Sequence, residues 1–383
     1  MSGAGFNGAR LREAREAREL TGVALASLVG QAPSTISEYE RGNVVPSPDA
    51  VDRLAGALNL PVTFFMRPSP LAASDRLTFR SRSAAAKTLR MRETRKFHWT
   101  VEVAAFLRDL VRYPDVSFPQ WQVPEDPRVL DDQQIDDLAL QLRRYWGLDD
   151  GPVPNVVELL ENNGAVIVRR ELGSEYIDAY SDWQYGVPHI VLGSDKLAAV
   201  RSRYDAAHEL GHLVLHRQVP SELMNQAAML KELERQAHFF AGSFLLPAET
   251  FGSDYIMPTL DSLLRLKPSW RVSVGVMIKR LAWLGFISSE KERLLWIARS
   301  RRGWTRREPH DDELLAEEPR LLRSALEALF GSARLTVGTL RVALPYSISD
   351  IEYLVGLPPD YLSELGRPSF RDEDDGRVIR FPN

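Results

Sequence analysis

RYDAAHELGHLVLH, residues 203–216, contains an HExxH pattern in which Glu209 directly follows His208 and His212 completes the motif. Residues four apart on a helix share one face, with their Cβ atoms about 5–6 Å apart, so two imidazoles at this spacing can bind one metal ion. A carboxylate at position 209 can reach the water that attacks a substrate. Two neutral histidine ligands, a general base and an open coordination position are typical of zinc peptidases. Because glycine destabilises a helix interior, Gly211 between the histidines indicates close packing at that point.

The pentapeptide alone does not decide between a metal site and an ordinary buried helix, since it also occurs by chance. Zinc bound in this way needs a third protein ligand, and LERQAHFFAGSFLLP at residues 233–247 offers one. The apolar residues of this segment recur at helical spacing, which predicts a second packed helix. Glu234 and His238 lie four residues apart on another face of that helix. A buried helix that keeps a carboxylate there has a use for it.

HELGHLVLH followed by ExxAxxFAxxxLLP resembles the ImmA/IrrE family of metallopeptidases, and the resemblance covers residues 150–310. It implies a minimal zincin-like core that binds Zn²⁺. It also implies that the metal ligands are His208, His212 and Glu234, and that the catalytic base is Glu209.

The resemblance leaves two further histidines open. The family usually carries Asn at the place of His238, so this residue could ligate the metal, hydrogen-bond to Glu234 or only pack, and packing is the preferred interpretation. The same interpretation applies to His216, on the last turn of the first helix. For stabilisation of an oxyanion the sequence offers Tyr204, Tyr180 and His238 without deciding between them.

Length and composition describe the class of protein. A chain of 383 residues predicts two or three domains, and 44% hydrophobic with 26% charged residues is typical of a soluble globular protein. We expect a cytoplasmic protein without a membrane partner, because no apolar run has transmembrane length and the N-terminus lacks a hydrophobic signal region. The absence of cysteine excludes disulfides and thiolate metal sites. With a net charge of −4, any DNA site has to be local.

The N-terminal residues predict a helix-turn-helix unit. Helices are expected over 9–20, 22–29, 33–42 and 48–58, with a short turn before the third. The stretch resembles the Cro/repressor-like (XRE) family at Ala26, Ile36, the Glu40-Arg41-Gly42 ending and the run from Leu54 to Leu58. This resemblance implies a double-stranded DNA operator as partner. It places at the major groove four residues of the third helix, namely Pro33, Ser34, Glu38 and, nearby, Thr35.

The charge of the N-terminal residues does not decide whether this unit binds DNA. Residues 1–67 hold seven basic and seven acidic side chains, so the unit has no net positive field. The alternative is a helical bundle used for dimerisation or peptide binding. Residues 76–96 carry eight Lys or Arg and one Glu. This run is either a solvated helix face or the source of the phosphate contacts that the first domain lacks. A homodimer is another way to raise the affinity for DNA, since it doubles the number of contacts.

We expect a multidomain α+β fold that is mostly α. The predicted domains are a helix-turn-helix domain at 1–68, a basic and Pro-rich linker with helices at 69–130, a zincin-like metallopeptidase domain at 131–257, and a C-terminal helical module and tail at 258–383, for which a winged module is one alternative. Strand-like runs at 165–169, 177–183 and 189–192 predict a small antiparallel sheet before the HExxH helix. Its edge strand can pair with an extended peptide.

Two functions follow from these patterns. The first is a DNA-binding zinc endopeptidase that cleaves a repressor or another regulatory protein, with Glu209 as the base. The alternative is a non-catalytic transcription regulator or antitoxin-like repressor that uses the zincin core as a sensor or a partner-binding fold.

Overall fold

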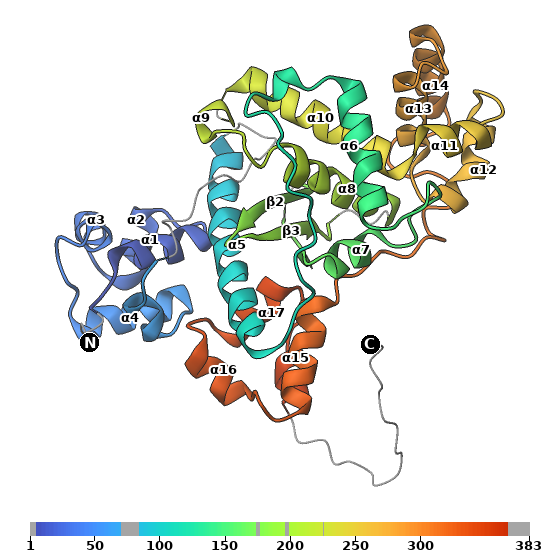
Figure 1. Ribbon diagram of the computed structural model, residues 1–383. Coiled ribbons are helices and arrows are strands. Elements are labelled where there is room, and N and C mark those ends of the chain that lie inside the picture. The colour runs from blue at the N-terminus through green and yellow to red at the C-terminus, as the bar shows by residue number, and fades with distance from the viewer. Residues whose placement is uncertain (1–4, 70–83, 174–176, 196–198, 225, 367–383) are drawn as a thin grey trace, which may run out of the picture.

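The computed structural model describes residues 5–69, 84–173, 177–195, 199–224 and 226–366. These residues form a mostly helical molecule around one three-stranded sheet (Figure 1). The predicted fold class, mostly α with a helix-turn-helix bundle at the N-terminus and a small sheet, is confirmed. In the described part of the chain, no helix combines the length and the apolar character needed to cross a bilayer.

Local capping chemistry sets the bounds of the N-terminal helices. The side chains of Thr21 and Ser47 accept hydrogen bonds from backbone N–H groups three residues later, at 3.0 and 3.3 Å, and begin two of the helices. Gly30 and Gly42 take the left-handed conformation that ends two of them. The bundle comprises α1 Gly8–Ala17, α2 Gly22–Val29, α3 Pro33–Arg41, α4 Pro48–Leu58 and the 3₁₀ helix η1 Val62–Met66.

The segment predicted as a linker contains the longest helix of the described chain. α5, Ala84–Leu110, is one helix of 27 residues, and it packs on α1 and on helices near the C-terminus. Its residues Phe97, Trp99 and Leu107 are fully buried. The predicted linker with helices thus contains a helix that belongs to the core, because the apolar positions after the basic run continue its helical period.

The three helices that follow lead to the sheet. After an extended segment come η3 Pro127–Val129, α6 Asp132–Tyr145 and α7 Val156–Asn162. The side chains of Asp131 and Gln134 form a capping box that begins α6.

The sheet is mixed, whereas the sequence predicts an antiparallel one. β1 Val166–Arg170, β2 Ala179–Gln184 and β3 Val187–Gly193 pair in the order β1-β3-β2. β2 and β3 form a hairpin through the two-residue turn Tyr185-Gly186, in which both residues have positive φ. β3 is buried along almost its whole length and takes the central position, so β1 pairs with its other edge and runs parallel to it.

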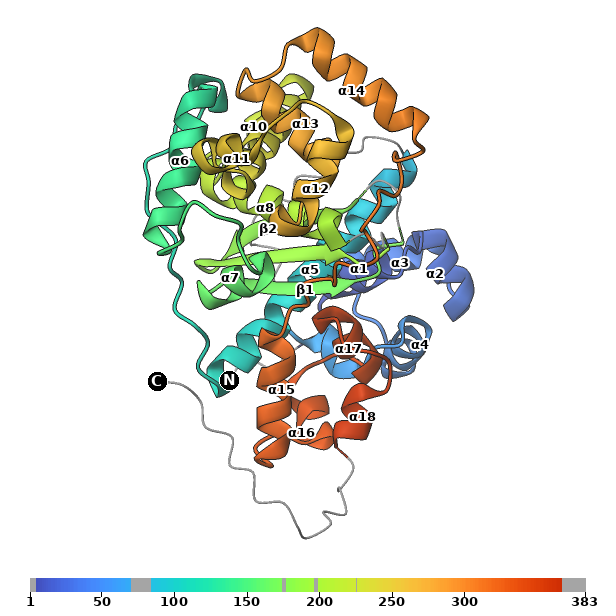
Figure 2. The ribbon, with the colours of Figure 1, turned by 90° about the vertical axis from the view of Figure 1, so that its right-hand side faces the viewer.

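This sheet separates two hydrophobic cores, because successive side chains of a strand point to opposite faces. Val166, Val168 and Val191 face a core shared by the N-terminal bundle, α5 and the last helices of the chain. Ile167 and Ile190 face the core that contains the HExxH helix. Figure 2 shows the sheet between these two groups of helices.

The C-terminal residues are divided between the two cores. α11 Ala248–Asp254, α12 Leu260–Trp270, α13 Val274–Trp283 and α14 Ser289–Arg301 belong with the HExxH helix. α15 Leu321–Gly331, α16 Val337–Ala343, α17 Ile348–Val355 and α18 Tyr361–Leu365 pack with α5 and the N-terminal bundle. Among the described residues after 258 there is no strand, so the structure gives no support to a wing.

A buried charged network joins the sheet to α5. The guanidinium of Arg170 in β1 donates to Glu93 at 3.3 Å and to the Tyr180 hydroxyl at 2.8 Å, and Tyr180 donates to Glu93 at 3.0 Å. Burial alone would lower the pKa of Arg170, but Tyr180 and Glu93 raise it, so the guanidinium stays charged. Tyr180 thus lies on the sheet face opposite the HExxH helix, and the suggestion that it stabilises an oxyanion is wrong.

His189 in β3 makes the stability of the fold sensitive to acid. Its ring packs beside Phe97, and its Nδ1 lies 3.0 Å from the Val187 carbonyl, to which it donates. Burial lowers the pKa of His189 from 6.5 to about 4. The folded state therefore holds the neutral ring, and stability that is full above pH 6.5 is lost as the pH falls toward the folded-state pKa.

We predict that lowering the pH from about 7.5 to about 5 removes about 2 kcal/mol of unfolding free energy through His189. His189→Gln, which does not titrate, should lose less stability than wild type over the same interval. Urea unfolding of both proteins at both pH values measures the difference, and the other histidines cancel in the comparison. Equal losses in the two proteins would show that His189 does not carry this acid sensitivity.

Candidate metal centre

Two helices cross closely at the candidate site. α8 Ala199–Leu215 carries the HExxH residues, and α10 Ala227–Leu245, which follows the short α9 Ser221–Met224, carries Glu234. A Cβ added at Gly211 would lie 3.1 Å from the Cα of Ala237 and 3.2 Å from its carbonyl oxygen. The predicted close packing at Gly211 is confirmed, and it lets α10 approach the histidine-bearing face of α8.

The crossing brings three donor groups together. His208 Nε2 and His212 Nε2 lie 3.1 Å apart, and the Glu234 carboxylate oxygens lie 3.4 Å from the first and 3.5 Å from the second. Within the described residues these three form a group whose ligand atoms are all within 4.8 Å of one another. Zinc–ligand bonds of about 2.0–2.2 Å place the ligands of a tetrahedral site about 3.3–3.6 Å apart. The spacing and the two-nitrogen, one-carboxylate donor set therefore fit zinc.

The electrostatics of the group favour a carboxylate. Burial alone would raise the pKa of Glu234, but hydrogen bonds with His208 and His212 override this effect and lower the pKa. Glu234 is thus ionised, as a metal ligand has to be.

A hydrogen-bonded chain behind His212 fixes the orientation of its ring. His212 Nδ1 lies 2.9 Å from His216 Nδ1, and His216 Nε2 lies 3.2 Å from the Gln236 side-chain oxygen. The Gln236 amide in turn donates to the Pro127 carbonyl at 2.6 Å. If His212 Nε2 binds a metal, its proton sits on Nδ1, and each group in this chain then has one donor and one acceptor in the required order.

His216 is buried, as the sequence predicts, but it is also hydrogen-bonded within this chain. Burial, followed by the neighbouring His212, holds the pKa of His216 well below its usual value, so its ring is neutral. Gln236 is a residue that the sequence patterns do not identify, because it lies two residues from Glu234 and shares no motif with it.

Glu209 is held beside the group by the sheet. Its side chain is buried, and one carboxylate oxygen accepts a hydrogen bond of 2.7 Å from the Ser181 hydroxyl in β2. Ser181 is another residue that the sequence motifs do not identify. The signal was the alternation in β2, where Ala179 and Trp183 face the same core as α8 and Ser181 lies between them.

His238 and Tyr204 lie next to the donor group. The His238 ring lies 4.3 Å from the His208 ring, centroid to centroid, and stacks on Tyr204. The Tyr204 hydroxyl lies 3.0 Å from His238 Nδ1. His238 is not one of the three grouped donors, which agrees with the preferred interpretation of a packing residue.

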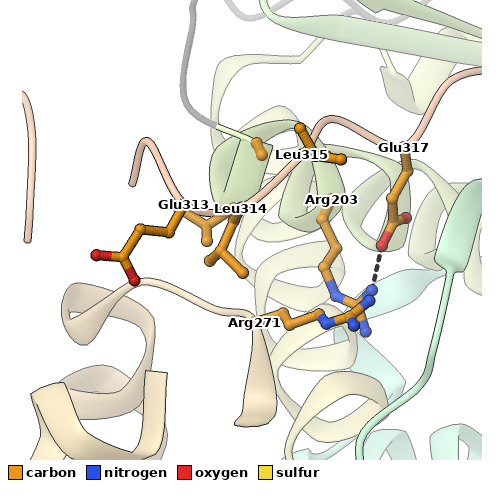
Figure 3. A pocket seen from close by; sticks show the side chains of 8 residues that line it. Arg203, Arg271, Glu313, Leu314, Leu315 and Glu317 are labelled. Carbon is orange, nitrogen blue, oxygen red and sulfur yellow. Dashed lines mark hydrogen bonds and ion pairs between the residues drawn. The ribbon is translucent and has the colours of Figure 1, made fainter. Parts of the chain in front are cut away.

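An ion pair anchors the first half of α8. Arg203 is buried and pairs with Glu317, and both line a pocket of about 260 Å³ with Arg271, Leu314 and Leu315 (Figure 3). The other oxygen of Glu317 accepts from the backbone N–H groups that begin α7, at 2.8 and 3.2 Å. One carboxylate thus ties α8 to α7 and to the segment before α15.

The four residues predicted to face DNA lie on α3. Pro33 and Ser34 are exposed at its start, and Thr35 and Glu38 are partly exposed. The Glu38 carboxylate accepts from Asn43 at 2.8 Å and from Arg41 at 2.7 Å, and these bonds, that of Asn43 first, lower its pKa. The surface position of the four residues is consistent with the predicted role, which stays a prediction.

Several residues of the basic run at 76–96 are not available for contacts with DNA. Residues 76–83 of it lie outside the described chain. In α5, Arg92 pairs with Glu93 and Glu19, and Arg95 pairs with Glu16 at 2.7 Å. Burial lowers the pKa of Lys96 to about 8, and its ammonium lies 4.1 Å from the Tyr353 ring centroid. These three residues are partly buried and already paired or packed, so they do not form a solvated face; phosphate contacts by the rest of the run stay a prediction.

We predict that Gly211→Ala lowers the unfolding free energy by about 1–3 kcal/mol, because the added methyl group meets the backbone of α10 rather than a side chain that can move. The same change should weaken metal binding by displacing Glu234. Gly56→Ala in α4 is the matched control, since nothing lies within 4 Å of its added Cβ and alanine favours the helix. Thermal unfolding and zinc titration of both variants measure the effects. A stabilising Gly211→Ala would contradict the close crossing.

Comparison with known proteins agrees with this geometry. Residues 160–282 match the family model of the IrrE N-terminal-like domain, and residues 8–63 match a model of a helix-turn-helix domain. No curated protein matches the chain. The first match runs from α7 through the sheet and the two crossing helices into α13, and the second covers the N-terminal bundle. The chain therefore contains an IrrE N-terminal-like domain, which is of metallopeptidase type, behind an N-terminal helix-turn-helix domain.

Proposed function

We propose that this protein is a zinc-dependent endopeptidase joined to a DNA-binding module, and that its substrate is a repressor or another regulatory protein. The observation that carries the proposal is the group of His208, His212 and Glu234, whose donor atoms have the spacing of a tetrahedral zinc site. The buried Glu209 beside it supplies a base. The helix-turn-helix match supports a regulatory context, and the choice of a repressor as substrate is an analogy.

Different residues of the site have different roles in the proposed hydrolysis of an amide bond. His208, His212 and Glu234 would hold the zinc ion, which when bound polarises a scissile carbonyl and acidifies water. Glu209 accepts a proton from the attacking water and donates it to the leaving nitrogen as the C–N bond breaks. The Ser181 hydroxyl orients the Glu209 carboxylate for this transfer. The Tyr204 hydroxyl lies 3.0 Å from Nδ1 of His238, whose ring packs on His208, and it is a candidate donor to the developing oxyanion.

β2 offers a place for the substrate backbone. It is an edge strand of the sheet, and it packs on α8. An extended peptide that pairs with the edge of β2 that carries no strand in the described sheet lies next to Ser181 and Glu209, because those residues are already in contact.

We predict that Glu209→Gln keeps about one zinc per chain and loses peptidase activity by about 10²–10⁴-fold, because the amide keeps the shape of the carboxylate but is no base. Zinc is measured on the purified protein, and cleavage is measured on candidate repressors and labelled casein. His208→Ala is the control that should lose both metal and activity, whereas His238→Ala should keep most of its metal. Undiminished cleavage by Glu209→Gln would rule out its role as the base.

A second candidate function is transcriptional regulation without catalysis, with the zincin-like core as a sensor. The observation that favours it is the exposed start of α3, where Pro33 and Ser34 are available to a DNA groove. In this case the protein binds an operator and cleaves nothing, and Glu209→Gln leaves regulation unchanged.

We predict that Glu38→Ala in the full chain relaxes base preference at one operator position and leaves the salt dependence of binding almost unchanged. Lys87→Ala, an exposed residue of the basic run, should reduce the slope of log affinity against log salt by about one unit if it contacts phosphate. Operator selection followed by fluorescence anisotropy at several salt concentrations measures both effects. If wild type shows no sequence-selective binding at low salt, α3 is not a DNA-reading helix.

A further inference from the structure

A second cavity opens beside the metal centre. It has a volume of about 730 Å³ and lies between α8 and α10 on one side and α13 and α14 on the other. We call it the α13 pocket and define it by six of its lining residues, Arg201, Tyr204, His238, Lys279, Trp283 and Trp296. These four helices lie on the same side of the sheet (Figure 2).

The α13 pocket lies next to the candidate metal centre. Tyr204 and His238 line it, and the His238 ring lies 4.3 Å from the ring of His208. A peptide held at the metal centre therefore has a side-chain pocket within reach on this side.

Two indoles form the apolar wall of the pocket, and glycines let them lie directly on helix backbones. A Cβ added at Gly242 would lie 2.7 Å from Trp283, and one added at Gly275 would lie 3.2 Å from Trp296. Trp283 also packs on Phe239 in α10, with centroids 5.0 Å apart. These contacts fix the indoles as a preformed surface for an apolar or aromatic group.

The polar lining of the pocket is cationic. Four of its residues are Arg or Lys, against a single carboxylate, that of Asp132. Lys279 pairs with Glu292 at 3.1 Å and Arg299 with Glu308 at 2.9 Å, while Arg235 pairs with Glu232. Arg201 is exposed and has no carboxylate within ion-pair distance in the part of the chain that the structure describes. Arg201 is therefore the cation whose charge a ligand can neutralise.

The start of α13 is not the anion site. Glu308 already accepts hydrogen bonds from the backbone N–H groups of Val274 and Gly275, at 2.8 and 3.2 Å. An acidic ligand group is thus directed to the side chains of Arg201 and Lys279 rather than to the helix end.

We propose that the α13 pocket is a specificity subsite that binds an acidic side chain of a protein substrate together with a neighbouring aromatic or apolar side chain. The proposal rests on the proposed peptidase function for the peptide nature of the ligand. The acidic group pairs with Arg201, with Lys279 at the rim, and the apolar group lies on the indoles. Basic and aromatic residues together also suit single-stranded nucleic acid. A peptide is favoured because the pocket lies next to the candidate metal centre, with His238 common to both surroundings.

Binding tests the subsite separately from catalysis. The zinc-loaded full-length Glu209→Gln protein is titrated with short fluorescein-labelled peptides that carry either Glu-Phe or Gln-Phe at the centre of an otherwise identical sequence, and anisotropy is recorded. We expect the Glu-Phe peptide to bind about tenfold more tightly, as a charge-assisted hydrogen bond implies. In Arg201→Glu this preference should disappear or reverse. Arg293→Glu, an exposed arginine of α14 outside the pocket, is the matched control and should keep the preference.

The outcomes separate the two proposals. If the charge preference depends on Arg201 but wild type cleaves no peptide, the subsite stands and the peptidase function fails. If wild type cleaves peptides but Glu-Phe and Gln-Phe bind equally, or Arg201→Glu changes nothing, the subsite is overturned and the peptidase function stands. Displacement of the Glu-Phe peptide by oligothymidylate, with tighter binding of the oligonucleotide, would overturn the subsite in favour of nucleic acid.

Discussion

The close crossing of α8 and α10 at Gly211 is the constraint on which the candidate site depends. His208 and His212 come from one helix, so their spacing is set by helical geometry alone. A third donor from another helix reaches both nitrogens only if the two backbones nearly touch. The added Cβ at Gly211 would lie 3.1 Å from the Cα of Ala237, so a side chain here would require the backbone of α10 to move away. The 3.4 and 3.5 Å distances from Glu234 to the two imidazoles follow from this contact.

The same crossing aligns further pairs along the two helices. His238 packs against His208 at one end, and Gln236 bonds to His216 at the other. The residues two and four positions after Glu234 in α10 thus also contact histidines of α8. The centre is supported in the direction of the α13 pocket by Tyr204 and His238, and in the opposite direction by the chain of bonds that ends at the Pro127 carbonyl.

Local chemistry explains what the sequence could predict. The helices of the N-terminal bundle begin and end at caps such as Thr21 and Gly42, and the HExxH spacing is a property of one helix. The errors concern contacts between distant residues. The parallel pairing of β1 depends on which strand becomes central, and the place of Tyr180 depends on the face to which β2 turns it. Gln236 supports the site through hydrogen bonds that no local pattern encodes, and the alternation of β2 shows only which face Ser181 takes, not its bond to Glu209.

Ion pairs hold the N-terminal bundle against the rest of the molecule and leave the proposed DNA-binding helix exposed. Arg10 pairs with Glu102 at 2.6 Å, and Arg18 with Asp350 at 2.7 Å, so α1 uses its positive charge to hold the bundle against α5 and α17. α3 packs on α1 and α2 and lies away from α5 in Figure 1. Docking therefore occupies α1 and leaves the exposed start of α3 accessible. The consequence is electrostatic: the arginines that hold the bundle in place cannot also neutralise phosphates, so strong operator binding has to draw on charge or contacts from outside the bundle.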